Sequence, residues 1–318
     1  MFDLPVRIHV FVVCWPGKEA SARSIAAAIR NSADRLTVLY KNDTGIDETG
    51  AGEWVRFPNE WYYGRQFQHC LSLCDGDAML QIQADAAFDD WPLLVERFRW
   101  ALANVPEMGI WTPNIYHTWY TPNLTEICKI WGDELSSVIV SDGVVWGLRR
   151  PVIDRMAGLD YGRTSIGWGI AEAAAAITNR DGRIIVMDNT LLVDHPQGSS
   201  YDRAKALAQS NAFVAQLTLA EQSYVHWINV TCVARNRKNP LRFLQGSYWR
   251  RRLEHLLPRS GKAHLVGTSE LRAAVIFPDQ SGEDVPARAE RFADGRKPAL
   301  RPKRFVEVGP LLPTVNKE

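Results

Sequence analysis

The sequence predicts an α/β protein whose first half is a wound parallel sheet flanked by helices. Residues Ile8–Cys14 form an almost continuous apolar, β-branched run, which is typical of a strand buried on both faces of a parallel sheet. Residues 18–33 carry apolar side chains at helical spacing, and residues 36–40 form a second strand-like run. A strand, a helix and a strand at this spacing make a βαβ unit, in which the two strands lie parallel.

The alternation of strand-like and helical segments continues along the chain. Helical spacing is found in residues 64–73, 91–105, 151–156, 171–179 and 202–219. Strand-like runs are found in residues 78–82, 109–112, 137–148, 183–187 and 190–193, and Asp142-Gly143 interrupts the third of these. Beyond Ser223 the pattern weakens. From Gln280 onward the chain is rich in Pro, Gly and charge, which predicts an extended or partly disordered tail.

Length and charge suggest how the chain is divided. We expect a main domain over residues 1–220, a basic helical extension over 221–279 and the tail over 280–318, in a chain of 318 residues. From Arg235 to the end there are 18 Lys and Arg against 9 Asp and Glu, and the remainder carries 19 against 27. This basic end would meet an anionic partner or form a solvated basic surface, and we expect no nucleic-acid partner.

Cysteine usage and hydropathy indicate the compartment. The number of cysteines is five, which is odd, and no spacing resembles a zinc site, so we expect reduced core thiols and a cytoplasmic protein. Residues 1–7 lack the apolar core of a signal peptide. No run approaches the roughly 18 apolar residues of a membrane-spanning helix, so any membrane contact would be peripheral.

An acidic residue, Asp85, follows the predicted strand 78–82. The carboxyl ends of parallel strands are where α/β sheets bind ligands. A carboxylate there could hold a divalent cation that bridges two phosphates, because hard cations take oxygen ligands. The alternative is a cap for the helix that starts near Trp91, although Asp89 is better placed for that role.

A second candidate is the loop Gly167-Trp168-Gly169, followed by Glu172 at a predicted helix start. The glycines allow the backbone to approach a flat ligand, and the indole offers a stacking face for a sugar ring. Glu172 could deprotonate an acceptor hydroxyl as a general base. The alternative is an acidic residue that complements the helix dipole.

Three further residues complete the candidate set. His195 follows a short strand, and its imidazole could be a ligand for Mn²⁺ or a structural side chain. Asp43, in the turn after the second strand, could accept hydrogen bonds from a uracil or a ribose, or serve the turn alone. Arg65 and His69 lie one helical turn apart and could face a pyrophosphate, with Arg65 the better placed.

In their order and spacing, these motifs resemble the family-2-type glycosyltransferases of the GT-A fold. Gly76-Asp77 precedes a strand that leads to Asp85, where the family has Asp-x-Asp. Gly167-Trp168-Gly169 with Glu172 resembles the family's Gly-Trp-Gly and Glu-Asp signature. Asp194-His195-Pro196 resembles its metal-ligand histidine region.

The resemblance covers about residues 7–205 and implies a GT-A-like wound mixed sheet flanked by helices, with a helical C-terminal extension. It also implies transfer of a sugar, with inversion, from a UDP-linked donor to an acceptor hydroxyl, in surface-glycan or exopolysaccharide synthesis. The acceptor would be a glycan or a lipid-linked molecule. The implied roles are Mn²⁺ or Mg²⁺ binding by Asp85 and His195, catalysis by Glu172, donor binding by Asp43, Arg65, Asp85 and Trp168, and acceptor binding by Gly167, Trp168 and Gly169.

Two departures from the family keep other functions open. Gln83 stands where the first acid of Asp-x-Asp would be, and Ala171 replaces the first acid of Glu-Asp. These changes favour, as the alternative, a catalytically degenerate protein that binds nucleotides or sugars. A nucleotidyltransferase would need a Gly-rich basic loop, of which residues 15–18 are a poor version, and a cysteine hydrolase at Cys14 lacks a His–acid partner pattern.

The stretch that begins at Leu241 and ends at Leu257 mixes aromatic side chains with four arginines along a helical period. Such a segment could rest on an anionic membrane at its inner face, or hold a lipid-linked acceptor. The alternative is an ordinary helix that packs on the main domain.

Overall fold

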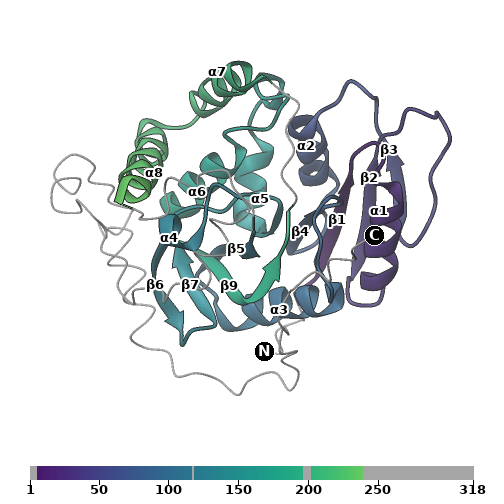
Figure 1. Cartoon of the computed structure of the whole chain (residues 1–318), viewed down its shortest axis with the longest axis horizontal. Coiled ribbons are helices and arrows are strands. Elements are labelled where there is room, and N and C mark those ends of the chain that lie inside the picture. The colour runs from purple at the N-terminus through teal and green to yellow at the C-terminus, as the bar shows by residue number, and fades with distance from the viewer. Residues whose placement is uncertain (1–5, 117, 196–201, 239–318) are drawn as a thin grey trace, which may run out of the picture.

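The computed structural model describes residues 6–116, 118–195 and 202–238. Their strands form one mixed sheet in the order β3-β2-β1-β4-β8-β5-β9-β7-β6, with helices on both faces (Figure 1). The predicted wound mixed sheet flanked by helices is therefore confirmed. The strands are β1 (Ile8–Cys14), β2 (Arg35–Tyr40), β3 (Glu53–Arg56), β4 (Ala78–Gln83), β5 (Met108–Ile115), β6 (Glu126–Trp131), β7 (Leu135–Val138), β8 (Val145–Arg149) and β9 (Ile184–Val193).

The helices are α1 (Glu19–Ile29), α2 (Tyr63–Leu73), α3 (Trp91–Asn104), α4 (Pro122–Thr125), α5 (Arg150–Ala157), the short 3₁₀ helix η1 (Tyr161–Arg163), α6 (Ile170–Arg180), α7 (Arg203–Val214) and α8 (Leu219–Lys238). Helices α1, α2, α3, α5 and α6 differ by a few residues from predicted segments, whereas α4 and η1 were not predicted.

The first half of the sheet is parallel, as predicted. Strand β1 pairs in parallel with β2 and β4, and β2 pairs in parallel with β3. Every residue of β1 is buried. Phe11 and Val13 pack into the cluster that also holds α2, α5 and α6, whereas Val10 and Val12 pack on the other face with α1 and α3. The continuous apolar run thus reflects a strand covered on both sides.

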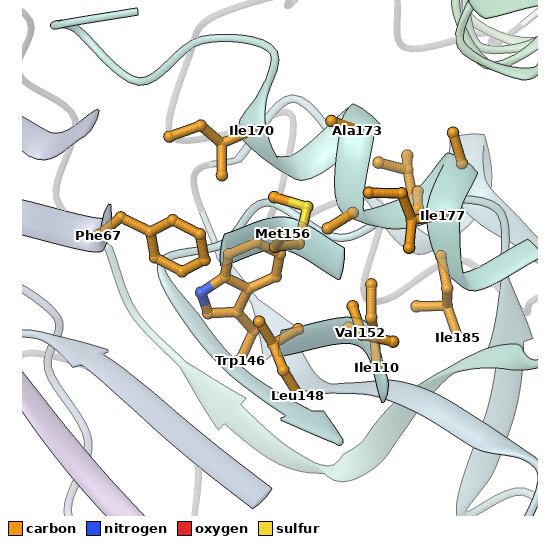
Figure 2. Packing of buried hydrophobic residues seen from close by; sticks show 14 of the residues in the cluster. Phe67, Ile110, Trp146, Leu148, Val152, Met156, Ile170, Ala173, Ile177 and Ile185 are labelled. Atoms are coloured by element: carbon orange, nitrogen blue, oxygen red, sulfur yellow. The ribbon is translucent and has the colours of Figure 1, made fainter. Parts of the chain in front are cut away.

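The second half of the sheet packs against α5 and α6. Figure 2 shows Trp146 and Leu148 of β8 close to Met156 of α5 and Ile170 and Ile177 of α6, and all five side chains are almost fully buried. Burial of each such side chain is worth about 1.5–3 kcal/mol. This apolar contact fixes the amino end of α6, which carries Glu172, relative to the sheet.

The sequence prediction for residues 137–148 was wrong in one respect. The run is two strands, β7 and β8, which are separated by β5 and β9 in the sheet. The two predicted strands at 183–187 and 190–193 are instead one strand, β9, with an irregularity: its pairing with β5 jumps from Asp188 to Leu192 between consecutive residues of β5. The Asp188 carboxylate accepts hydrogen bonds from the Thr190 amide and hydroxyl, which forms a turn at this irregularity.

The predicted helix 202–219 is likewise two helices, α7 and α8. Thr218 and Glu221 form a reciprocal capping box at the start of α8: the Thr218 amide donates to Glu221 Oε2 at 2.9 Å, and the Glu221 amide donates to Thr218 Oγ1 at 3.4 Å. Helical structure then continues to Lys238, well past the point at which the sequence pattern weakens.

The predicted domain boundary near residue 220 coincides with the start of α8 and stays a prediction. The rest of the basic extension, the segment from Leu241 to Leu257 and the tail 280–318 lie outside the described residues. Among the described helices, none is both long enough and apolar enough to cross a membrane.

None of the five cysteines forms a disulfide, and Cys14, Cys70, Cys74 and Cys232 are buried; their reduced state stays a prediction. Burial, followed by the charges of Glu19 and Glu48, raises the pKa of Cys14 to about 12. A thiol with so high a pKa is a poor nucleophile at neutral pH, so the structure argues against a cysteine hydrolase.

Candidate functional site

The candidate residues lie on the side of the sheet where its parallel strands have their carboxyl ends, which is called the carboxyl edge below. Strands β1, β2, β4, β5 and β9 all end at this edge, and the antiparallel β8 begins there. Helices α2 and α6 precede β4 and β9, so their amino ends point to the same edge. In an α/β sheet this is the edge at which ligands bind.

Asp85 and His195 meet although they are far apart in the sequence. Ala87 and Asp194 form an isolated antiparallel bridge, with backbone hydrogen bonds of 2.8 and 2.9 Å. This bridge joins the segments that follow β4 and β9, and it brings His195 Nε2 to 3.5 Å from Asp85 Oδ2. Both side chains are partly exposed to solvent.

Carboxylates surround the imidazole. Burial by itself would lower the pKa of His195, but the hydrogen bond that the imidazole donates to Asp85 and the charges of Asp85, Asp142 and Asp194 outweigh it and raise the pKa. Negative charge concentrated at a partly exposed position favours a cationic ligand.

Asp85 and His195 fit a divalent cation for which they would be two of several ligands. Asp85 Oδ1 is buried and has no hydrogen-bond partner among the described residues. An unsatisfied carboxylate oxygen beside an imidazole is a donor pair that suits Mn²⁺ or Mg²⁺. Within the described ranges, no group of three or more His, Cys, Asp and Glu side chains could hold a metal.

The structure explains why position 83 carries an amide. Gln83 Nε2 donates to the Gly143 carbonyl at 3.5 Å, and the same carbonyl accepts from Tyr63 Oη at 3.2 Å and Gln81 Nε2 at 3.3 Å. A carboxylate at position 83 could not donate to a carbonyl oxygen. The residue that replaces the family's first acid therefore helps to anchor the loop that carries Asp142.

The Gly167-Trp168-Gly169 loop owes its glycines to packing. Gly167 and Gly169 have φ values of +97° and +91°. A Cβ atom on Gly167 would lie 2.3 Å from Tyr63 Cδ1, and the amide of Gly64 donates to the Ser165 carbonyl at 3.1 Å. Gly167 is thus pressed against the amino end of α2, and a Cβ atom on Gly169 would lie 2.9 Å from Ser210 Oγ of α7, so packing accounts for both glycines without a ligand. Trp168 itself is 37 % exposed, so its indole is accessible for stacking.

Glu172 lies in the first turn of α6, and its Oε1 accepts a hydrogen bond from the hydroxyl of Tyr120. Burial, and next the charge of Glu172, raise the pKa of Tyr120 well above its ordinary value, so the phenol stays neutral. The charge of Asp142 raises the pKa of both Tyr120 and His195. Sequence reasoning missed Tyr120 and Asp142, because neither belongs to a motif.

The other two predicted residues, Asp43 and Arg65, make their contacts outside these two pairs. Asp43 is exposed in the turn after β2, beside the buried Lys41, whose pKa is lowered by burial and raised in part by Asp43. Lys41 Nζ donates to the Trp61 carbonyl at 2.9 Å. Arg65 Nη1 donates to Gln68 Oε1 at 2.9 Å. The donor-binding roles of Asp43 and Arg65 stay predictions.

The cap of α3 is neither of the residues considered from the sequence. Asp90 Oδ1 accepts from the Leu93 amide at 3.0 Å, so Asp90 is the cap rather than Asp89 or Asp85. Asp85 is therefore not required for helix capping, which removes the structural alternative for this residue.

No protein-family model and no curated protein matches this sequence. Solved structures do match. A mannosyltransferase from Pyrobaculum calidifontis, in complex with GDP-Man and Mn²⁺, matches with a TM-score of 0.50 and 15 % identity over 92 % of this chain and 87 % of its own. GalNAc-T7 with UDP, GalNAc and Mn²⁺ matches with a TM-score of 0.44 and 11 % identity over 71 % of this chain and 55 % of its own.

A UDP-glucose pyrophosphorylase complexed with UDP-glucose matches with a TM-score of 0.40 and 10 % identity, over 67 % of this chain and all of its own. At these identities the likeness concerns the fold. The chain has the mixed, Rossmann-like α/β sheet of the GT-A fold, which glycosyltransferases and nucleotidyltransferases share.

Proposed function

We propose that this protein is a glycosyltransferase that moves a sugar from a nucleotide-sugar donor to an acceptor hydroxyl with inversion. The observation that supports this most is the placement of two carboxylates, Asp85 with His195 and Glu172 with Tyr120, at the carboxyl edge of a GT-A-like sheet. The solved mannosyltransferase and GalNAc-T7 both hold a nucleotide or nucleotide-sugar together with Mn²⁺, and we extend that ligand class to this chain.

On the donor side, Asp85 and His195 would hold Mn²⁺ or Mg²⁺. Such an ion, when bound, neutralises the negative charge of the diphosphate leaving group. Asp43 would contact the nucleoside and Arg65 the pyrophosphate. We propose a UDP-linked donor. The GDP-linked sugar that the mannosyltransferase binds is the alternative donor, and the experiment below compares the two.

On the acceptor side, Glu172 would take the proton of the attacking hydroxyl. The acceptor oxygen forms a bond to the anomeric carbon as the bond to the diphosphate oxygen breaks, so the nucleoside diphosphate departs with that electron pair. A single displacement of this kind inverts the anomeric centre. The amino end of α6 favours a carboxylate at this position, and the exposed Trp168 would stack on a sugar ring.

We propose a glycan or lipid-linked acceptor in surface-glycan or exopolysaccharide synthesis. In this setting the protein would be cytoplasmic, with peripheral contact at the inner face of the membrane through residues 241–257.

Calorimetry and product analysis test the proposal. UDP, UDP-sugars and GDP-mannose are titrated with and without Mn²⁺ into the wild type and into Asp85→Ala, and the products are analysed by mass spectrometry. We expect binding of a UDP-linked sugar that depends on Mn²⁺ and on Asp85, together with release of UDP. Failure of every nucleotide-sugar to bind would contradict the proposal.

A second function is favoured by the amide at position 83. Because Gln83 is hydrogen-bonded to Gly143, only Asp85 of the usual acid pair is available, as expected for a protein that binds nucleotide-sugars without transfer. The same titration separates the two functions, since binding without hydrolysis or transfer would support the second.

A further inference from the structure

We infer that Tyr120 is a positioning residue for Glu172: its hydroxyl holds one oxygen of the carboxylate and leaves the other for the acceptor hydroxyl. This inference rests on the proposed function, in which Glu172 is the base. It stands on a direct contact, since Tyr120 Oη donates to Glu172 Oε1. Charge-assisted hydrogen bonds of this kind are short and strong, so they restrict the rotamer of a carboxylate.

The backbone that carries Tyr120 is itself fixed. The Tyr120 amide donates to Thr118 Oγ1 at 3.2 Å, and the Thr121 amide donates to the Trp119 carbonyl at 3.0 Å. Thr118 and Thr121 are buried, and α4 begins at the next residue, Pro122. The phenol is thus presented by an ordered turn that leads into a helix.

Helix α8 supports both partners of the contact. It packs against α6, which carries Glu172, and against α4, which follows Tyr120. Arg235 Nη1 of α8 donates to the Leu124 and Glu126 carbonyls, both at 2.8 Å, and so binds the carboxyl end of α4. Helix α6 carries four consecutive, fully buried alanines at positions 173–176, and such small side chains permit a close approach of its neighbours. The distance between Tyr120 and Glu172 is therefore set by rigid elements.

The chemistry of the phenol suits this role. Burial and the neighbouring carboxylate favour the neutral form of Tyr120, so at neutral pH it acts as a donor to Glu172. A neutral donor orients the carboxylate without compensating its charge, whereas a lysine or arginine would form an ion pair with it. The remaining oxygen keeps the negative charge that a proton acceptor needs.

The first experiment measures transfer kinetics. In Tyr120→Phe we expect kcat to fall about tenfold or more, as for loss of a hydrogen bond to a charged group, with little change in KM for the donor. In a Glu172→Gln background the same substitution should have no further effect, because its target is gone. Tyr161→Phe is the matched control: it removes a buried hydroxyl that donates to the Met156 carbonyl at 3.1 Å.

Equal losses of kcat from Tyr120→Phe in both backgrounds, or a loss that appears only as a higher donor KM, would overturn the inference. The kinetic arm needs an active wild type, so a second measurement is made on the folded protein without substrate.

The second experiment follows the ring-carbon NMR signals of labelled tyrosines through an alkaline titration. Tyr120, assigned by the absence of its signal in Tyr120→Phe, should ionise at higher pH than an ordinary tyrosine, and Glu172→Gln should move its titration to lower pH. An unchanged Tyr120 titration in Glu172→Gln would overturn the inference even if the enzyme is active. If the wild type transfers no sugar but the titration shifts as expected, the contact stands and the proposed function fails.

Discussion

The two carboxylates at the candidate site have different partners. Asp85 lies beside an imidazole whose pKa is raised by neighbouring carboxylates, and its Oδ1 has no hydrogen-bond partner among the described residues. Glu172 instead accepts from the neutral phenol of Tyr120. An unsatisfied oxygen in an acidic surrounding suits a cation, whereas a carboxylate oriented by a neutral donor suits proton transfer. The partners, more than the acids themselves, thus suggest a division of roles.

The largest expected effect concerns Glu172. Glu172→Gln keeps the shape of the side chain but cannot accept a proton, so we expect kcat to fall by about 10²–10⁴-fold, with the affinity for UDP in Mn²⁺ unchanged. Steady-state kinetics and calorimetry measure the two quantities. Glu96→Gln on the exposed face of α3 is the control and should be neutral. A loss of UDP binding with normal kcat would mean that the roles of the two carboxylates are reversed.

A smaller effect is expected at the other carboxylate. Asp85→Asn removes the charge beside His195, so we expect UDP to bind about tenfold or more weakly in Mn²⁺, a cost of about 1.4 kcal/mol or more. After treatment with EDTA, wild type and variant should bind UDP equally, because the difference depends on the cation. Asp89→Asn, on the same segment but exposed, is the control. An equal loss in EDTA would show that Asp85 acts without a metal.

The next prediction tests whether Gly167, in the loop before the helix that carries Glu172, is required for packing. Gly167→Ala forces a Cβ atom into the Tyr63 ring at a φ of +97°, so we expect a loss of about 2–4 kcal/mol in the free energy of unfolding by urea. Gly132→Ala is the control, since its φ is +54° and nothing lies within 4 Å of the added atom. Its loss should be about 1 kcal/mol. Similar losses at both positions would contradict the packing explanation for Gly167.

The smallest effect is expected at position 83. Gln83→Glu removes the amide that donates to the Gly143 carbonyl, which should lower the free energy of unfolding by about 0.5–1.5 kcal/mol. We expect no gain in Mn²⁺-dependent binding of UDP. Gln83→Leu separates loss of the amide from addition of a charge. Stronger metal dependence in Gln83→Glu alone would show that position 83 can still serve as a ligand, and that this chain has lost an acid of the usual pair.

Much of the fold could be predicted from local patterns. Strands β1, β2 and β4 and helices α1 to α3 lie close to their predicted bounds, because each carries a clear apolar period. The predictions were wrong where the period is weak. The four-residue strand β3 and the hairpin of β6 and β7 are short, and the apolar period of α8 is weak because its buried residues include the polar Glu221, Thr231 and Arg235.

The candidate site could be predicted only in part. Asp85, His195 and Glu172 were identified because they occur in motifs, and the structure places all three at one edge of the sheet. Tyr120 and Asp142 carry no such signal. Tyr120 lies in the connection after β5 and Asp142 in the loop before β8, and the positions of both side chains depend on where those strands lie in the sheet. Gly167 and Gly169 had a signal in the sequence, but its physical cause is close packing, of Gly167 against Tyr63 of α2 and of Gly169 against Ser210 of α7.

The sequence by itself determined the βαβ start of the sheet, the helix that presents Glu172 and the acid after β4, because these depend on the period and order of neighbouring residues. Only the tertiary structure decided that β8 inserts antiparallel beside β4, that Asp194 bridges to Ala87 and that Tyr120 reaches Glu172. These contacts join residues that are distant in the chain. Their free energy depends on which strands pair and which helix faces pack together, and no local sequence pattern contains that information.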